Sequence, residues 1–92
     1  MKQAEKLYLG VIAQHGCIVC GEDAEVHHPR FAAGLGQKAS HYLAFPLCPF
    51  HHRHGGKYAI HGDPQHFKMA FGDEPALLAE FLKQRWEGKD HD

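Results

Sequence analysis

The chain has 92 residues, of which 43% are hydrophobic, so we expect one folded domain over residues 1–92 and not a disordered chain. Its formal net charge is −1 with neutral histidines, which argues against a protein that binds nucleic acid through a strongly basic surface alone. Residues 1–5 do not resemble a signal peptide and no apolar run could span a membrane, so we expect a cytoplasmic protein without a membrane partner.

The first elements expected along the chain are a helix and a short strand. Residues 2–15 form the helix, because Leu7, Val11 and Ile12 recur at helical spacing, with Leu9 off this apolar face. After a turn, residues 24–28 form a strand that Pro29 ends. Residues 30–40 are expected to form an ordered loop.

A second strand and a short helix follow. Residues 43–47 alternate between large and small side chains, as a half-buried strand does, and Pro46 limits this strand to a sheet edge or ends it early. Pro49 suits the first turn of a helix that carries three histidines as far as Gly55. Residues 58–62 are expected to add a short strand or a turn.

Two helices are expected within residues 63–88. Asp63 and Pro64 suit the N-cap and first turn of a helix that ends at Gly72. Asp73 can cap the last helix. The apolar stripe expected on that helix comprises Leu78, Phe81, Leu82 and Trp86. The predicted fold class is therefore α+β, with a small core over residues 16–62 and flanking N- and C-terminal helices.

The cysteines and histidines indicate metal binding. The chain has ten histidines and three cysteines. Histidine is the commonest metal ligand, and an odd number of cysteines fits a closed disulfide framework poorly. The ligand pairs Cys17/Cys20 and Cys48/His51 would together form a tetrahedral zinc site, which would stabilise so short a chain. The alternative is that Cys48 is a core thiol and the first pair is coincidental.

Two pairs of adjacent histidines, His27–His28 and His51–His52, suggest a catalytic role in addition to the zinc site. If His51 completes the zinc site, His52 points elsewhere and is free. Neighbouring residues of a strand also point to opposite faces, so His27 and His28 would take different roles. Phosphodiester hydrolysis uses such a division, with a metal that stabilises the phosphate charge and an imidazole that acts as general base.

These segments resemble the HNH, or ββα-metal, nucleases, and within them the phage recombination-enhancement nucleases, which depend on RecA. The matching segments are Cys17–Gly21, His27–Arg30, Gly34–Ser40 and Phe45–His52. The resemblance implies a ββα-metal core, a structural zinc ion and a second divalent metal for catalysis, namely Zn²⁺, Mg²⁺, Mn²⁺ or Ni²⁺.

The resemblance also implies roles for single residues. His28 falls on the position of the general base, and His27 and His52 fall on ligands of the catalytic metal. His61 is a further candidate ligand of the catalytic metal, and His54 is a less favoured candidate.

One position departs from the HNH pattern. Its middle asparagine is missing, because the chain contains no Asn. Ser40 or His41 could take its place beside the general base. His41 is therefore counted among the catalytic candidates, and Arg53 joins them because it lies between ligand positions. Arg30, Lys38 and Lys57 flank the expected site and could contact phosphates.

The sequence thus predicts a hydrolase, namely a metal-dependent DNA endonuclease associated with phage or prophage recombination in a bacterial or phage-infected cytoplasm. Its expected partners are DNA and a RecA filament. Two alternatives stay open. One is a non-catalytic zinc-binding module for nucleic acid or a protein partner, and the other is a histidine-rich metal-storage or sensor protein. The sequence does not indicate an oligomeric state.

Overall fold

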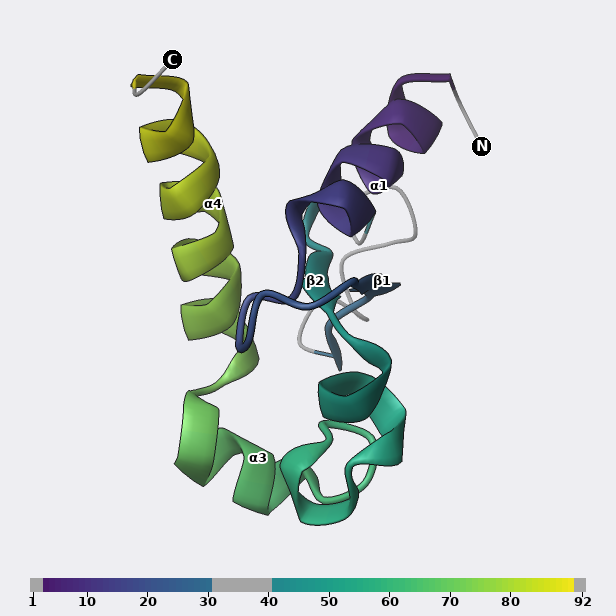
Figure 1. Cartoon of the computed structure of the whole chain (residues 1–92), viewed down its shortest axis with the longest axis vertical. Helices are drawn as coiled ribbons and strands as arrows, with labels where there is room; N and C mark the ends of the chain where they lie inside the picture. The colour runs from purple at the N-terminus through teal and green to yellow at the C-terminus, as the bar shows by residue number, and fades with distance from the viewer. Residues whose placement is uncertain (1–2, 31–40, 91–92) are drawn as a thin grey trace.

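A two-stranded sheet lies at the centre of the fold. The computed structural model describes residues 3–30 and 41–90. Its elements are α1 (Gln3–His15), β1 (Glu25–His27), β2 (Phe45–Leu47), the short helical turns η2 (Phe50–His54) and η3 (Gly56–Tyr58), α3 (Pro64–Phe71) and α4 (Glu74–Asp90). The helices α1 and α4 project toward one end of the molecule, whereas α3 and the η2–η3 segment lie at the other end (Figure 1). This small α+β arrangement agrees with the expected class.

The sheet is antiparallel, with Val26 opposite Pro46 and His27 opposite Phe45. Proline lacks a backbone N–H and is tolerated here because both strands of a two-stranded sheet are edges. The carbonyl of Pro46 instead accepts a hydrogen bond from the Ile18 amide at 3.0 Å. Both strands lie within the expected ranges. The expected loop over residues 30–40 falls almost wholly outside the described residues, as do Lys38 and Ser40.

Helix α1 packs against both strands through a face that differs from the expected one. Ile12 is fully buried and Leu9 is packed against the core, whereas Leu7 is 62% exposed. Glu5 lies on the same face, at helical spacing from Leu9 and Ile12, and is buried although it is charged. A pattern read from apolar residues alone leaves Glu5 out, so it placed the buried face wrongly: Leu7 lies outside it and Leu9 within it.

Helix α3 begins and ends at the predicted residues, and α4 begins as predicted but continues to Asp90, two residues beyond its expected end at residue 88. The Asp63 carboxylate accepts a hydrogen bond from the His66 amide at 3.0 Å, and Pro64 follows it in the first turn. Gly72 ends α3 with a φ of 107°, which glycine adopts without strain. The Asp73 carboxylate then accepts from the Ala76 amide at 2.9 Å and caps the start of α4.

Only the first half of α4 has an apolar face that is buried. Leu77, Leu78 and Phe81 are buried, but Leu82 is 47% and Trp86 is 73% exposed. The predicted stripe was therefore wrong for these last two residues. The helix packs against β2 near its start and then extends beyond the body of the molecule (Figure 1). No helix among the described residues is long and apolar enough to cross a membrane.

This packing predicts opposite effects for two aromatic residues of α4. Phe81→Ala should lower the free energy of unfolding by about 3–5 kcal/mol, because it leaves a cavity in the core. Trp86→Ala, the matched control, should change it by no more than about 0.5 kcal/mol. Urea unfolding of the zinc-loaded variants would measure both. Equal destabilisation by the two substitutions would contradict the exposure of Trp86.

Candidate metal centres

Three thiols and one imidazole converge between α1 and η2. Cys17, Cys20, Cys48 and His51 each offer a ligand atom, and these atoms all lie within 4.8 Å of one another. The turn after α1 brings the first two together, because the Cys17 carbonyl accepts from the Gly21 amide at 2.8 Å. The amides of Val19 and His51 donate to the sulfurs of Cys17 and Cys48, each at 3.4 Å. Backbone donors therefore already orient two of the sulfurs.

The separations within this Cys₃His cluster suit a tetrahedral zinc ion. With Zn–S of about 2.3 Å and Zn–N of about 2.0–2.1 Å, the S–S edges of such a site are about 3.8 Å and the S–N edges about 3.6 Å. The sulfurs of Cys20 and Cys48 lie 3.7 Å apart, and His51 Nδ1 lies 3.3 Å from Cys48 Sγ and 3.9 Å from Cys17 Sγ. A cluster of three cysteines and one histidine could thus hold a zinc ion.

The thiols also resist ionising together in the absence of a cation. Burial, followed by contact with the thiols of Cys48 and Cys17, raises the pKa of Cys20 to about 11. Burial acts in the same direction on Cys17, but backbone hydrogen bonds outweigh it and its pKa is lowered. A bound cation would remove this conflict, because metal ligation deprotonates thiols outright.

A second cluster consists of three imidazoles. His27, His52 and His61 each offer a ring nitrogen, and these atoms also lie within 4.8 Å of one another. The Nε2 atoms of His52 and His61 are 3.1 Å apart, close to the edge of about 3.3 Å expected between two nitrogens on a tetrahedral zinc ion. Among the described residues, His27 Nδ1 is a buried side-chain nitrogen without a hydrogen-bond partner. A metal ligated by that nitrogen would satisfy it.

Two carboxylates hold the rings of this three-histidine cluster. His27 Nε2 lies 2.7 Å from the Glu74 carboxylate, and His52 Nδ1 lies 2.5 Å from the Glu25 carboxylate. Each carboxylate leaves the other nitrogen of its ring available. Carboxylate–histidine pairs of this kind orient metal ligands and raise their basicity. The arrangement is therefore more specific than three histidines that happen to be near one another.

The electrostatics favour neutral rings at two histidines of the cluster. Burial lowers the pKa of His27, and burial followed by the neighbouring His52 and Arg30 lowers the pKa of His61. Metals bind the neutral imidazole. Hydrogen bonds from Arg53 and then from His52 lower the pKa of Glu25 to about 2, so this carboxylate is ionised at neutral pH.

The backbone between η2 and α3 places His61 beside His52. The amides of Ile60 and His61 donate to the carbonyls of His51 and His52 at 2.9 and 3.1 Å. The chain can fold back against η2 in this way because residue 62 is glycine. An added methyl group at Gly62 would lie 2.2 Å from the Gly56 carbonyl oxygen. The close approach of these two glycines brings the ring of His61 into the cluster.

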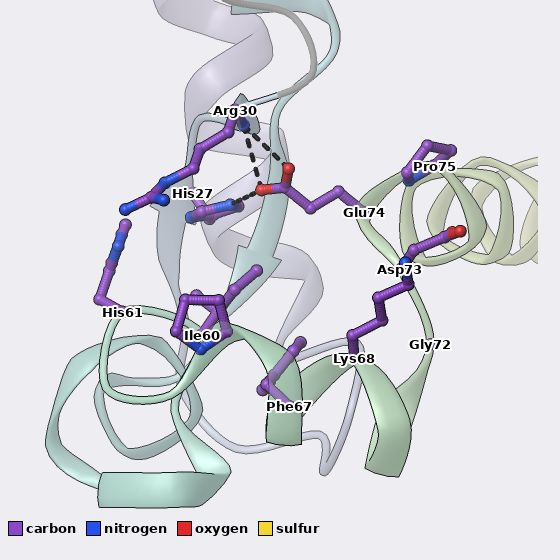
Figure 2. Close-up of a pocket in the computed structure, with 11 residues that line it drawn as sticks. His27, Arg30, Ile60, His61, Phe67, Lys68, Gly72, Asp73, Glu74 and Pro75 are labelled. Carbon is purple, nitrogen blue, oxygen red and sulfur yellow. Dashed lines mark hydrogen bonds and ion pairs between the residues drawn. The ribbon is translucent and has the colours of Figure 1, made fainter.

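A cavity of about 230 Å³ opens beside the three-histidine cluster. Its polar lining includes His27, His61 and Glu74, and Figure 2 shows the Arg30 side chain next to the ring of His61. The Arg30 amide donates to the Glu74 carboxylate at 3.0 Å, which fixes the backbone at this point. The apolar lining comprises Ile60, Pro64, Phe67 and Pro75, and Lys68 adds a second cation. The cavity therefore combines two cations and two carboxylates, Asp73 and Glu74, with an apolar lining.

His28 lies outside both clusters and has a partner of its own. Its Nε2 atom is 3.1 Å from His41 Nδ1, and its ring is exposed. His41 Nε2 in turn lies 3.7 Å from the carboxylate of Glu5. Burial and then the neighbouring His41 lower the pKa of His28. His41 thus stands beside the expected general base, whereas the alternative residue, Ser40, lies outside the described residues.

The remaining expected residues lie in different surroundings. Arg53 makes a two-pronged ion pair with Glu25, at 2.7 and 2.9 Å, and so supports the partner of His52. Lys57 lies over the ring of Tyr58, away from the cavity lining. Neither cluster includes His54 among the residues described.

Sequence reasoning missed the three carboxylates that orient histidines. Glu25 could have been found, because residues two apart on a strand share a face and Glu25 precedes His27 by two. Glu74 lies 47 positions along the chain from His27, and nothing in the local sequence joins the two. Glu5 sits on the helix that was expected only to pack.

Removal of one thiol should disrupt the Cys₃His cluster. Cys48→Ser should abolish zinc binding at this cluster and unfold most of the domain, because the free energy of metal binding contributes to folding. Cobalt substitution gives a sulfur-to-metal charge-transfer band that only this cluster can produce. The band should be lost in Cys48→Ser and kept in the control His54→Ser. A variant that keeps both band and thermal stability would exclude the assignment.

The carboxylates behind the three-histidine cluster should tune its metal affinity. Glu25→Ala should weaken zinc binding there by about 10–100-fold, because His52 loses the partner that orients it. A titration against a chromophoric indicator, begun with the Cys₃His cluster filled, would measure this. Glu80→Ala removes the same charge from an exposed position of helix α4 and should leave the affinity unchanged. Equal affinities in all three proteins would show that Glu25 has no such role.

Comparisons with known proteins give a family but no activity. No curated protein and no solved structure matches the chain. A family model does match, over residues 1–87, which include both clusters and the elements that carry them. Its description is "Protein of unknown function", so the function has to be argued from the residues. Because the match covers nearly the whole sequence, the chain belongs to the DUF968 family.

Proposed function

We propose that the protein is a metal-dependent endonuclease that hydrolyses phosphodiester bonds in DNA. The observation that carries the proposal is the three-histidine cluster, in which His27 and His52 are each held by a carboxylate. Structural zinc sites use four protein ligands, whereas catalytic sites use three and keep a position open for water or substrate. The Cys₃His cluster suits the first role, and the three-histidine cluster suits the second.

The two roles would be divided among this chain's own residues. His27, His52 and His61 would hold a divalent metal, which when bound would stabilise the charge that develops on the phosphate. Glu74 and Glu25 would keep the first two rings in place. Arg30, beside His61 in the cavity, would contact a phosphate of the DNA backbone (Figure 2).

His28 would act as the general base. It directly follows His27 along the chain, its ring is exposed, and His41 holds one of its nitrogens. In the proposed reaction its free nitrogen takes a proton from water, and the resulting hydroxide attacks phosphorus as the P–O bond to the leaving oxygen breaks. A histidine suits this role because its ordinary pKa lies near neutral pH.

The order of elements supports an HNH-type nuclease. Two antiparallel strands, β1 and β2, are followed by the helical turn η2, and the histidines lie on β1, at its end and on η2. This is the order of a ββα-metal core. A role in phage recombination, with a RecA filament that brings the DNA, is part of the same proposal. Such a partner would compensate for a net charge of −1, which gives the chain little electrostatic attraction for DNA.

A non-catalytic zinc module is the second candidate. The same net charge and the presence of a complete four-ligand cluster favour it. It would leave the carboxylate-backed second cluster without a purpose. The two functions differ in one measurable property, which is cleavage of DNA.

Substitution of the general base should abolish cleavage and leave the fold intact. His28→Ala should lower the rate of supercoiled-plasmid nicking by about 10²–10⁴-fold, the usual contribution of a general base. The assay would use a panel of divalent metals, with and without RecA filaments. His54→Ala, a histidine of the same chain outside both clusters, should cleave like the unsubstituted protein.

The outcomes separate the candidate functions. Metal-dependent nicking that is lost in His28→Ala and kept in His54→Ala supports the nuclease, and a requirement for RecA would support the recombination role. Zinc-loaded, folded protein that nicks no plasmid under any condition would favour the binding module. Equal nicking by both variants would remove His28 as the base.

A further inference from the structure

We infer that Glu5 is a positioning residue that fixes the proton arrangement of His41 and thereby makes Nδ1 the basic nitrogen of His28. Glu5 on α1 is only 5% exposed, although it is charged. Charged side chains are seldom buried without a partner. Its carboxylate lies 3.7 Å from His41 Nε2. Helix α1 thus contributes a carboxylate to the pair formed by His28 and His41.

The contact between His28 and His41 alone permits two proton arrangements for neutral rings, and the charge of Glu5, 3.7 Å from His41 Nε2, favours one of them. His28 Nε2 and His41 Nδ1 lie 3.1 Å apart, so one nitrogen must carry a hydrogen and the other must accept it. The Glu5 carboxylate can only accept and favours a hydrogen on His41 Nε2. His41 Nδ1 is then the acceptor, and His28 Nε2 is the donor. The lone pair of His28 is consequently on Nδ1.

This arrangement repeats the relation between carboxylate and histidine in the metal cluster, with one more ring in between. Glu74 and Glu25 each contact a proposed metal ligand directly, whereas Glu5 acts on His28 through His41. The inference deepens the proposed function, because it names the nitrogen that would take the proton from water. The proton arrangement itself exists without any reaction and can be measured without one.

The first test reads the ring protons directly. Two-bond ¹H–¹⁵N correlation spectra of the zinc-loaded protein, recorded well above the ordinary histidine pKa of about 6.5, report which nitrogen of each ring carries hydrogen. We expect Nε2–H for both His28 and His41. Hydrogen on Nδ1 of His28, or on Nδ1 of His41, would overturn the inference.

Two substitutions of Glu5 then test the cause. Glu5→Met fills the same buried space without an acceptor and should turn His41, and with it His28, into a mixture of both tautomers. Glu5→Gln keeps a carbonyl oxygen that can accept from His41 and should restore the Nε2–H form in most molecules. Unchanged spectra in Glu5→Met would overturn the inference. Because the wild-type spectrum is read first, it stays decisive if Glu5→Met fails to fold.

Cleavage kinetics give an independent reading. Glu5→Met should lower kcat by about 10–100-fold, the loss expected when a catalytic group is misplaced, with KM unchanged because Glu5 does not face the cavity. Glu5→Gln should recover most of kcat. A rise in KM without a fall in kcat would overturn the positioning role. If the wild-type protein does not cleave DNA but shows the expected tautomers, the nuclease proposal fails and the inferred proton arrangement stands.

Discussion

The convergence of Cys17, Cys20, Cys48 and His51 is the constraint on which the other features of the molecule depend. Its ligands come from the turn after α1 and from the residues around the start of η2. Both strands of the sheet lie between these two segments in the sequence. The buried core around it is small, as expected for a short chain. A metal at this point would hold α1, the sheet and η2 in one arrangement. The positions of the second group of histidines follow from that arrangement.

The link between the two clusters is the pair of neighbours His51 and His52. Adjacent residues of a helical turn do not face the same side, so one ring lies with the thiols and the other with His27 and His61. The carbonyls of the same two residues accept the amides of Ile60 and His61. The η2 turn thus supplies a ligand to each cluster and also positions the third imidazole. A closed site and an open site share one short piece of backbone.

Local sequence patterns were sufficient to predict the residues that cap α3 and α4. The short spacings between cysteines and histidines were sufficient to group the ligands of the Cys₃His cluster. Asp63, Pro64 and Gly72 act through bonds within one turn, so the sequence alone predicts them. Leu82 and Trp86 were wrongly predicted to be buried. Their exposure depends on where α4 stops packing against other elements, which is a tertiary property. Glu74 and Glu5 could not be assigned to histidines because each meets its partner only after folding. Glu25 is the intermediate case, since strand alternation points to it.

The shared backbone of His51 and His52 restricts how this protein can change over evolutionary time. A substitution at His54 alters one exposed side chain that belongs to neither cluster as described. An insertion or deletion between Cys48 and His52 would instead rotate one ring out of its cluster and shift the carbonyls that receive Ile60 and His61. We therefore expect stronger selection on the length of this segment than on most of its composition. Relatives that diverge widely elsewhere should still keep the same number of residues here.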